Sequence, residues 1–179
     1  SLAEVEATNP DYEASFAQYG DAAIVVISRP TAESKDYLPG SVAEGTGASE
    51  PLELTTNERE VIETAKKASD KVIVLINTAN AVEIGDLKND PDIDAILWIG
   101  LPGCYGMLGV ADILCGRVSP SGAMSDIYAT YNMSAPAMQN MGSFTYTNAE
   151  DVITRAKSQN YIIEAEGIYV GYRYYETRY

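Results

Sequence analysis

Three apolar runs predict the core of the protein. The first, Ala22 to Ile27, consists of six consecutive apolar residues, and we expect a strand that is buried on both faces. The runs Lys71 to Asn77 and Ile93 to Ile99 have the same character and predict two further strands. Strands of this kind belong to parallel sheets with helices on both faces. Such sheets bind their ligands beyond the carboxyl ends of the strands.

Helical patterns alternate with these strands. A helix is expected over Asn9 to Tyr19, where Asn9 or Asp11 can cap it. A second starts at Thr55 or Thr56 and continues through about Ala68, and Thr55 with Glu58 forms a capping box. A weak helix is expected within 81–90, and a further one over 107–116 that ends at Gly116.

The alternation of strands and helices predicts an α/β fold in one domain over residues 1–179. We expect a three-layer α/β/α sandwich with a mostly parallel sheet in a flavodoxin-like arrangement. Residues 30–54 form a long connection rich in Pro and Gly, and a loop of that length is usually functional or mobile. Towards the end of the chain we expect a short strand at 125–131, a loop at 132–148, a helix at 149–157 and an exposed-edge strand at 166–179.

Charge narrows the possible partners. The net charge is −14, from 26 acidic and 12 basic residues, and the basic residues do not cluster. This argues against nucleic acid and against an anionic membrane surface, and neutral substrates or cations fit better. There is no histidine, so any acid/base chemistry within the chain falls to carboxylates, Tyr, Lys or Cys.

The two cysteines are expected to be free thiols in the core. Cys104 and Cys115 are eleven residues apart in an expected helix, which separates them by roughly 16 Å. A disulfide needs Cα atoms within about 7 Å. The cysteines do not decide the compartment, and cytoplasmic and secreted locations both stay open. No signal peptide or membrane-length apolar run is expected, although the first residues resemble the start of a fragment.

Two motifs with possible ligands are better explained as structure. The segment Gly100 to Gly106, GLPGCYG, does not have the G-x-G-x-x-G spacing of a dinucleotide turn, so a tight strand–helix turn is expected. Asp90, Asp92 and Asp94 alternate around Pro91, which favours a solvated turn over a calcium loop. We therefore expect neither a metal nor an organic cofactor.

Six segments in order resemble one known family. They are VVISRPTAESKD, LELTTNE, VIVLINTANAVEI, ILWIGLPGCYG, ADILCGRVSPSGAMSDIYA and EGIYVGYRYYE. Together they are similar to the sandwich domain, usually called the C-terminal domain, of family 3 glycoside hydrolases. In β-glucosidases of that family the domain accompanies a catalytic (β/α)8 barrel.

The resemblance implies a catalytic role for Glu33. The family pattern S-R-x-x-G-E-G-x-D is similar to Ser28 through Asp36, with Ala32 and Ser34 in place of the two glycines. Glu33 then matches the acid/base glutamate, and Asp36 matches an aspartate that supports the loop. The nucleophile of such enzymes is an aspartate on the barrel, and no segment here resembles it.

The sequence thus predicts one piece of a retaining β-glucosidase-like enzyme that acts on β-linked glucosides or short oligosaccharides. Its expected partners are the barrel of the same enzyme and a carbohydrate, and homo-oligomerisation stays open. The alternative is a non-catalytic interdomain or carbohydrate-binding module. That alternative is favoured by the turn Gly100 to Met107, which lacks the polar pair of the family's W-x-P-G-Q-E-G-G segment.

Overall fold

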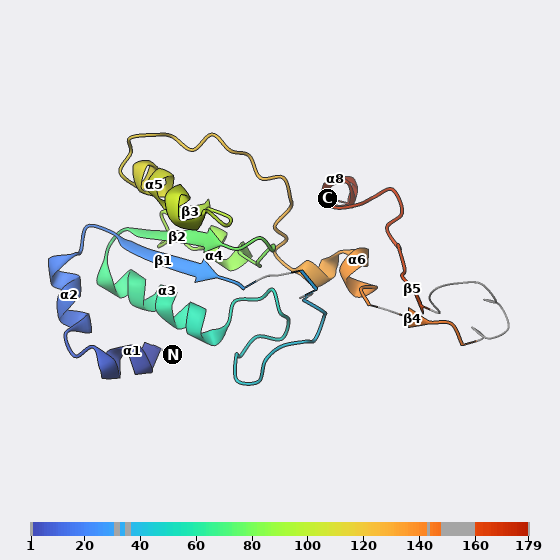
Figure 1. Cartoon of the computed structure of the whole chain (residues 1–179), viewed down its shortest axis with the longest axis horizontal. Helices are drawn as coiled ribbons and strands as arrows, with labels where there is room; N and C mark the ends of the chain where they lie inside the picture. The colour runs from blue at the N-terminus through green and yellow to red at the C-terminus, as the bar shows by residue number, and fades with distance from the viewer. Residues whose placement is uncertain (1, 31–32, 35–36, 143, 148–159, 179) are drawn as a thin grey trace.

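A parallel three-stranded sheet forms the centre of the protein (Figure 1). The computed structural model describes residues 2–30, 33–34, 37–142, 144–147 and 160–178. The strands β1 (Ala23–Ser28), β2 (Val72–Asn77) and β3 (Ala95–Trp98) lie in the order β1-β2-β3. Each coincides with one of the three apolar runs, so the three predicted strands are confirmed. The predicted burial of β3 is wrong within this chain, because Ala95 and Trp98 are exposed and Ile96 and Leu97 are only half-buried.

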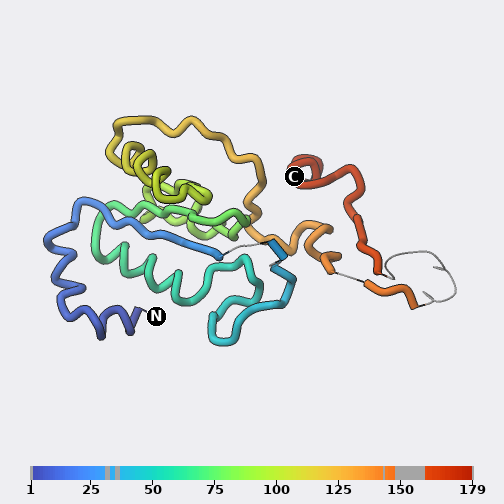
Figure 2. The backbone as a smooth tube through the Cα atoms, viewed as in Figure 1, coloured from blue at the N-terminus to red at the C-terminus, as the bar shows by residue number. Residues whose placement is uncertain are grey.

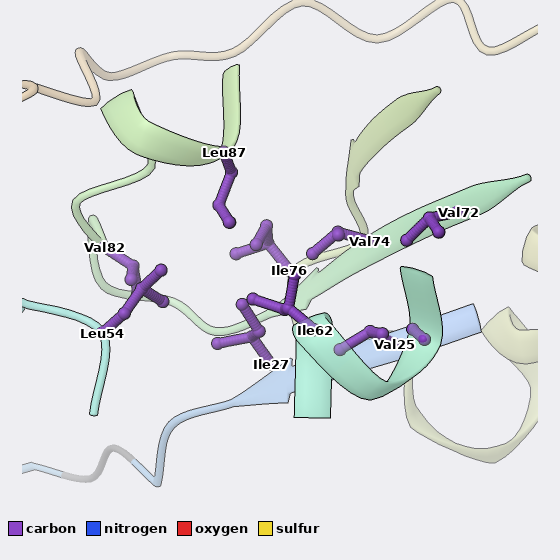
Figure 3. Packing of buried hydrophobic residues seen from close by; sticks show 10 residues of the cluster. Val25, Ile27, Leu54, Ile62, Val72, Val74, Ile76, Val82 and Leu87 are labelled. Carbon is purple, nitrogen blue, oxygen red and sulfur yellow. The ribbon is translucent and has the colours of Figure 1, made fainter. Parts of the chain in front are cut away.

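Helix α3 (Thr56–Ala68) covers one face of this sheet and completes the hydrophobic core. Its buried residues Ile62 and Ala65 pack against the strands. Figure 3 shows Ile62 pointing towards Val25 and Ile27 of β1. The further core residues are Leu54, Val72, Val74, Ile76, Val82 and Leu87. Alternate residues of β1 and β2 therefore point into one apolar layer between the sheet and α3.

Helix α5 (Gly103–Leu114) lies over the opposite face of the sheet, so the predicted three-layer α/β/α arrangement is confirmed. This helix begins four residues earlier than predicted. Gly116, with φ +69°, follows its end as expected of a helix C-terminus. The coverage on this side is incomplete. Ile24 and Val26 of β1 are 50% and 52% exposed, so the prediction that β1 is buried on both faces is wrong within this chain.

The predicted capping box at the start of α3 is confirmed. The Thr55 side chain accepts a hydrogen bond from the Glu58 backbone N–H, and the Glu58 carboxylate accepts one from the Thr55 N–H. The weak helix expected within 81–90 is α4 (Gly85–Asn89).

The single helix predicted over Asn9 to Tyr19 is instead preceded by another helix and starts later. Helix α1 (Leu2–Thr8) ends before Pro10, and α2 (Tyr12–Gln18) follows it. Pro10 disfavours helical backbone at the residue before it, which separates the two helices. Asp11 stands at the N-cap of α2 but its side chain makes no cap hydrogen bond. Both helices lie beside α3 (Figure 2).

The strand predicted at 125–131 is wrong. These residues run in irregular backbone, and Tyr128 contacts the segment after β2. Ala129 is buried, and the Tyr128 hydroxyl donates a 3.4 Å hydrogen bond to the Asn80 carbonyl. The apolar pattern here indicates that side chains are buried, although the segment does not pair as a strand.

The region predicted as loop at 132–148 contains short elements in its described part. These are η1 (Asn132–Ser134), α6 (Pro136–Gln139) and β4 (Phe144–Thr145), which pairs antiparallel with β5 (Asn160–Tyr161). The predicted helix at 149–157 lies outside the described residues.

The edge strand predicted at 166–179 is also wrong. Residues 165–168 form turns, and α8 (Tyr172–Arg178) follows. Gly167 and Gly171 have φ of +56° and +58°, which interrupts extended backbone before the helix starts. Two tyrosines of α8 contact η1: Tyr174 donates to the Ser134 carbonyl at 3.2 Å, and the Tyr175 and Ser134 hydroxyls share a hydrogen bond.

Both cysteines are free thiols, as predicted, but neither is buried: Cys104 and Cys115 are exposed in this chain. None of the helices in the described part of the chain has the length and apolar character needed to span a bilayer.

The uneven coverage of β1 gives a matched test of the core. Ile27 is 1% exposed and faces α3, whereas Ile24 is 50% exposed on the other face of the same strand. Ile27→Ala should lower the free energy of unfolding by about 2–5 kcal/mol. Ile24→Ala should lower it by about 1 kcal/mol or less, since only strand propensity and partial burial are lost. Urea unfolding of both variants measures the difference, and equal losses would contradict this layering.

Candidate functional site

The carboxyl ends of the three strands are joined by side-chain hydrogen bonds into one edge. The Ser28 hydroxyl donates to Asn77 Oδ1 at 3.2 Å, and Asn77 Nδ2 donates to the Gly100 carbonyl at 2.6 Å. The Trp98 indole N–H donates to the Thr78 carbonyl at 2.9 Å. Because ligands of parallel α/β sheets bind beyond this edge, the residues that leave it are the first candidates for a site.

Glu33 lies in a turn beyond the carboxyl end of β1. Its side chain is exposed. The next residue, Ser34, has φ +62°, a left-handed conformation that favours glycine. This is one of the two positions where the family pattern has glycine. Asp36, the second predicted site residue, lies outside the described residues, so its position relative to Glu33 is not described.

The turn that carries Glu33 is closed by a hydrogen bond across its base. The Tyr37 hydroxyl donates to the Pro30 carbonyl at 2.5 Å, which brings together the residues on either side of Glu33. Glu33 thus lies between two residues, Pro30 and Tyr37, that are in contact with each other.

The whole of the predicted long connection, residues 30–54, is called the Glu33 loop. Two of its glutamates accept hydrogen bonds from backbone N–H groups of the same loop. The Glu50 carboxylate accepts from the Gly40 N–H at 2.8 Å, and the Glu53 carboxylate accepts from the Ser49 N–H at 2.7 Å. Of the acids on this loop that could replace Glu33, Glu50 is therefore already engaged, whereas Glu44 is exposed.

Arg29 holds the two ends of the Glu33 loop together. It follows β1 directly, and its guanidinium donates to the carbonyls of Pro51 at 2.9 Å and Glu53 at 2.6 Å. It also forms a 2.7 Å ion pair with Glu58, the residue of the α3 capping box. No pattern in the sequence assigns this role to Arg29, because its partners are 22 to 29 residues away along the chain.

Glu83 is a second acid at this edge that sequence patterns do not single out. Its carboxylate accepts a hydrogen bond from the Asn132 backbone N–H at 2.7 Å, and its own N–H donates to the Leu52 carbonyl at 2.9 Å. Burial raises the pKa of the Glu83 carboxyl, and the negative charges of Glu53 and Glu50 add to that rise. The hydrogen bond from Asn132 opposes it.

The alternating aspartates have structural roles. Asp90 pairs with Lys66 of α3, and Asp94 accepts a hydrogen bond from the Val72 N–H at 2.8 Å. The hydrogen bond from Lys66 lowers the pKa of the Asp90 carboxyl. Across the residues that the structure describes, no group of three or more His, Cys, Asp or Glu is placed to hold a metal ion.

The glycine-rich segment after β3 is a turn into α5. Gly100 and Gly103 have φ of +56° and +59°, and a Cβ on Gly100 would lie 3.3 Å from the Trp98 ring. A cleft of about 610 Å³ lies between this segment, α5 and residues 118–124, and its lining contains no charged residue. It therefore offers no acid or base for catalysis.

The comparisons with known proteins agree on one family. The model described as "Glycosyl hydrolase family 3 C-terminal domain" matches residues 4–172. The chain is 30% identical to β-glucosidase A of Butyrivibrio fibrisolvens over 93% of its own length, and 27% identical to a β-glucosidase of Ruminococcus albus over 90%. It covers 20% and 14% of those two relatives.

A solved structure gives the same result. A β-glucosidase from Paenibacillus barengoltzii matches 92% of this chain with a TM-score of 0.68 and 33% sequence identity, and the match covers 16% of that protein. The chain therefore spans a fifth or less of the length of these similar proteins.

The raised pKa of Glu83 predicts a pH-dependent cost to stability. Because the folded state holds this proton more tightly than the unfolded chain does, wild-type stability falls as pH rises from the ordinary glutamate pKa through the raised one. Glu83→Gln keeps an acceptor oxygen for Asn132 but cannot ionise. It should be more stable than the wild type at pH 7, and the difference should vanish below about pH 4.

Urea unfolding from pH 3 to pH 8 measures this difference. Glu44→Gln, at an exposed glutamate of the Glu33 loop, is the matched control and should give no such trend. A Glu83→Gln variant that is less stable than the wild type at pH 7 would contradict the prediction.

Proposed function

The chain belongs to the glycosyl hydrolase family 3 C-terminal domain family, and we propose that it contributes the acid/base glutamate, Glu33, to the active site of a retaining β-glucosidase-like enzyme. The rest of that active site, including the nucleophilic aspartate, is contributed by a (β/α)8 barrel of the same enzyme. The observation that carries the proposal is the position of Glu33, an exposed turn residue beyond the carboxyl end of β1.

In the proposed mechanism Glu33 acts twice. It first donates its proton to the glycosidic oxygen while the barrel aspartate attacks the anomeric carbon, and the aglycone leaves as a neutral alcohol. It then takes a proton from water as the water oxygen attacks the same carbon and releases the aspartate. Retention requires the two carboxyl groups to lie about 5–5.5 Å apart. An exposed glutamate can reach that distance from a carboxylate on another domain.

The substrate class follows from family and charge together. The similar proteins are β-glucosidases, so terminal β-linked glucosides or short oligosaccharides are the proposed substrates. Neutral sugars suit a domain with a net charge of −14, since an anionic substrate would be repelled. The chemistry needs no metal or organic cofactor.

The second candidate is a non-catalytic interdomain or carbohydrate-binding module. It is favoured by the turn after β3, where Cys104 and Tyr105 replace the polar pair of the family segment and Tyr105 is 88% exposed. The full gene discriminates the two: a neighbouring barrel with an aspartate nucleophile supports catalysis, and a gene without one supports a module.

The 179-residue chain by itself should be inactive on aryl β-glucosides. It carries one of the two carboxylates that the mechanism requires. The measurement is release of nitrophenol by the purified chain beside a buffer blank. Turnover above the blank would overturn the shared active site.

Glu33→Ala in the full-length enzyme should reduce hydrolysis in a way that depends on the leaving group. Aryl glucosides with poor leaving groups need protonation and should lose roughly 10²–10⁴-fold in kcat/KM. Dinitrophenyl glucosides should lose far less, because dinitrophenolate leaves without a proton. Azide should then increase turnover of the activated substrates, since this anion attacks the glycosyl-enzyme without a general base.

Glu44→Ala is the matched control, an exposed glutamate on the same loop. It should leave all substrates at wild-type rates with no effect of azide. If Glu33→Ala behaves as Glu44→Ala does, Glu33 is a surface residue and the acid/base role belongs elsewhere.

A further inference from the structure

We propose that Arg29 is the positioning residue for Glu33: it joins the two ends of the Glu33 loop and so determines where the carboxylate lies. This inference rests on the proposed function of Glu33. Its structural basis is the bonding of the guanidinium, which lies between the end of β1, the returning loop and the N-terminus of α3.

The guanidinium is held from several directions. It donates to two backbone carbonyls, Pro51 and Glu53, and pairs with the Glu58 carboxylate, all between 2.6 and 2.9 Å. The Arg29 and Glu58 side chains are only 12% and 19% exposed. A planar, permanently charged group with five donors suits this arrangement of acceptors, whereas a lysine ammonium is a point charge on a flexible stem.

Glu58 connects this contact to the start of α3. The same oxygen that pairs with Arg29 accepts from the Thr55 N–H at 2.7 Å and from the Thr55 hydroxyl at 2.9 Å. Helix α3 is itself fixed on the sheet by Ile62 and Ala65. The returning end of the Glu33 loop is therefore attached, through Arg29, to the strand from which the loop leaves.

Glu33 lies four residues beyond Arg29 along the chain, so we expect the position of the carboxylate to depend on that of Arg29. The Tyr37–Pro30 hydrogen bond closes the turn, but it does not attach the turn to the sheet. A displacement of about 1 Å between reacting groups can cost about 10²-fold in rate. Because the Arg29 charge is paired with Glu58, we assign it no contact with substrate. Its effect on catalysis passes through Glu33.

The test uses the full-length enzyme with Arg29→Met, which keeps the length and removes the donors. kcat/KM on poor leaving groups should fall about 10²-fold, and kcat/KM on dinitrophenyl glucosides should fall much less, because dinitrophenolate leaves without a proton from Glu33. Arg29→Lys should lie between Arg29→Met and the wild type. Arg59→Met is the matched control, because Arg59 pairs with Asp86 across an exposed contact with side chains 50% and 74% exposed, and it should change neither kcat/KM nor its leaving-group dependence.

A second measurement does not depend on catalysis. Hydrogen exchange of the backbone amides of residues 37–54 should become faster in Arg29→Met than in the wild type, and not in Arg59→Met. If Arg29→Met does not fold, Glu58→Gln replaces it, because it removes the charge of the pair while keeping an acceptor for Thr55. It should show the same leaving-group dependence to a smaller extent.

The outcomes separate this inference from the function on which it rests. Equal losses on all substrates, or a wild-type rate for Arg29→Met, would overturn the positioning role. So would unchanged exchange at residues 37–54. If Glu33→Ala keeps wild-type rates on poor leaving groups, the proposed function of Glu33 fails, whatever Arg29→Met does. Leaving-group-dependent losses in both Glu33→Ala and Arg29→Met support both.

Discussion

The packing of Ile62 and Ala65 against the sheet fixes the geometry on which everything else at this edge depends. It sets α3 against β1 and β2, and so places the capping box of Thr55 and Glu58 beside the residue that follows β1. The charge of Arg29 can then be buried because a carboxylate and two carbonyls meet it there. An apolar layer of ordinary composition thereby determines where a long polar loop begins and ends.

The parts of the fold that follow from local chemistry could be predicted from the sequence. Three apolar runs became β1, β2 and β3, and the spacing of Thr55 and Glu58 specified the start of α3 within a residue. The runs did not indicate which faces of the strands are covered by other parts of the chain. Ile24 and Val26 are as apolar as Val25 and Ile27 but remain half exposed, because a hydrophobic pattern records which residues favour burial and not which segment of a protein buries them.

The C-terminal third departs from its pattern for a different reason. The patterns at 125–131 and 166–179 resemble those of strands, but a strand needs a partner whose backbone groups pair with its own. In these segments tyrosine hydroxyls bond to backbone carbonyls instead. At Gly171 the backbone turns into α8, and Tyr174 and Tyr175 of α8 bond to Ser134. Short aromatic runs satisfy either geometry locally, so the contacts made at a distance decide.

The site shows the same division between local and distant contacts. Glu33 was found through a family pattern, whereas Arg29 acts through partners more than twenty residues away that no spacing rule reveals. At Ser34 both the family pattern and the contacts within the fold are relevant. It keeps the left-handed backbone of the glycine in that pattern, at a cost of about 1 kcal/mol for a residue with a Cβ. A turn with free ends would relax to avoid that cost. Here the Tyr37–Pro30 hydrogen bond joins a residue before Ser34 to one after it, and Arg29, next to Pro30, is held by the Pro51 and Glu53 carbonyls. The left-handed residue therefore lies in a segment that is attached at both ends.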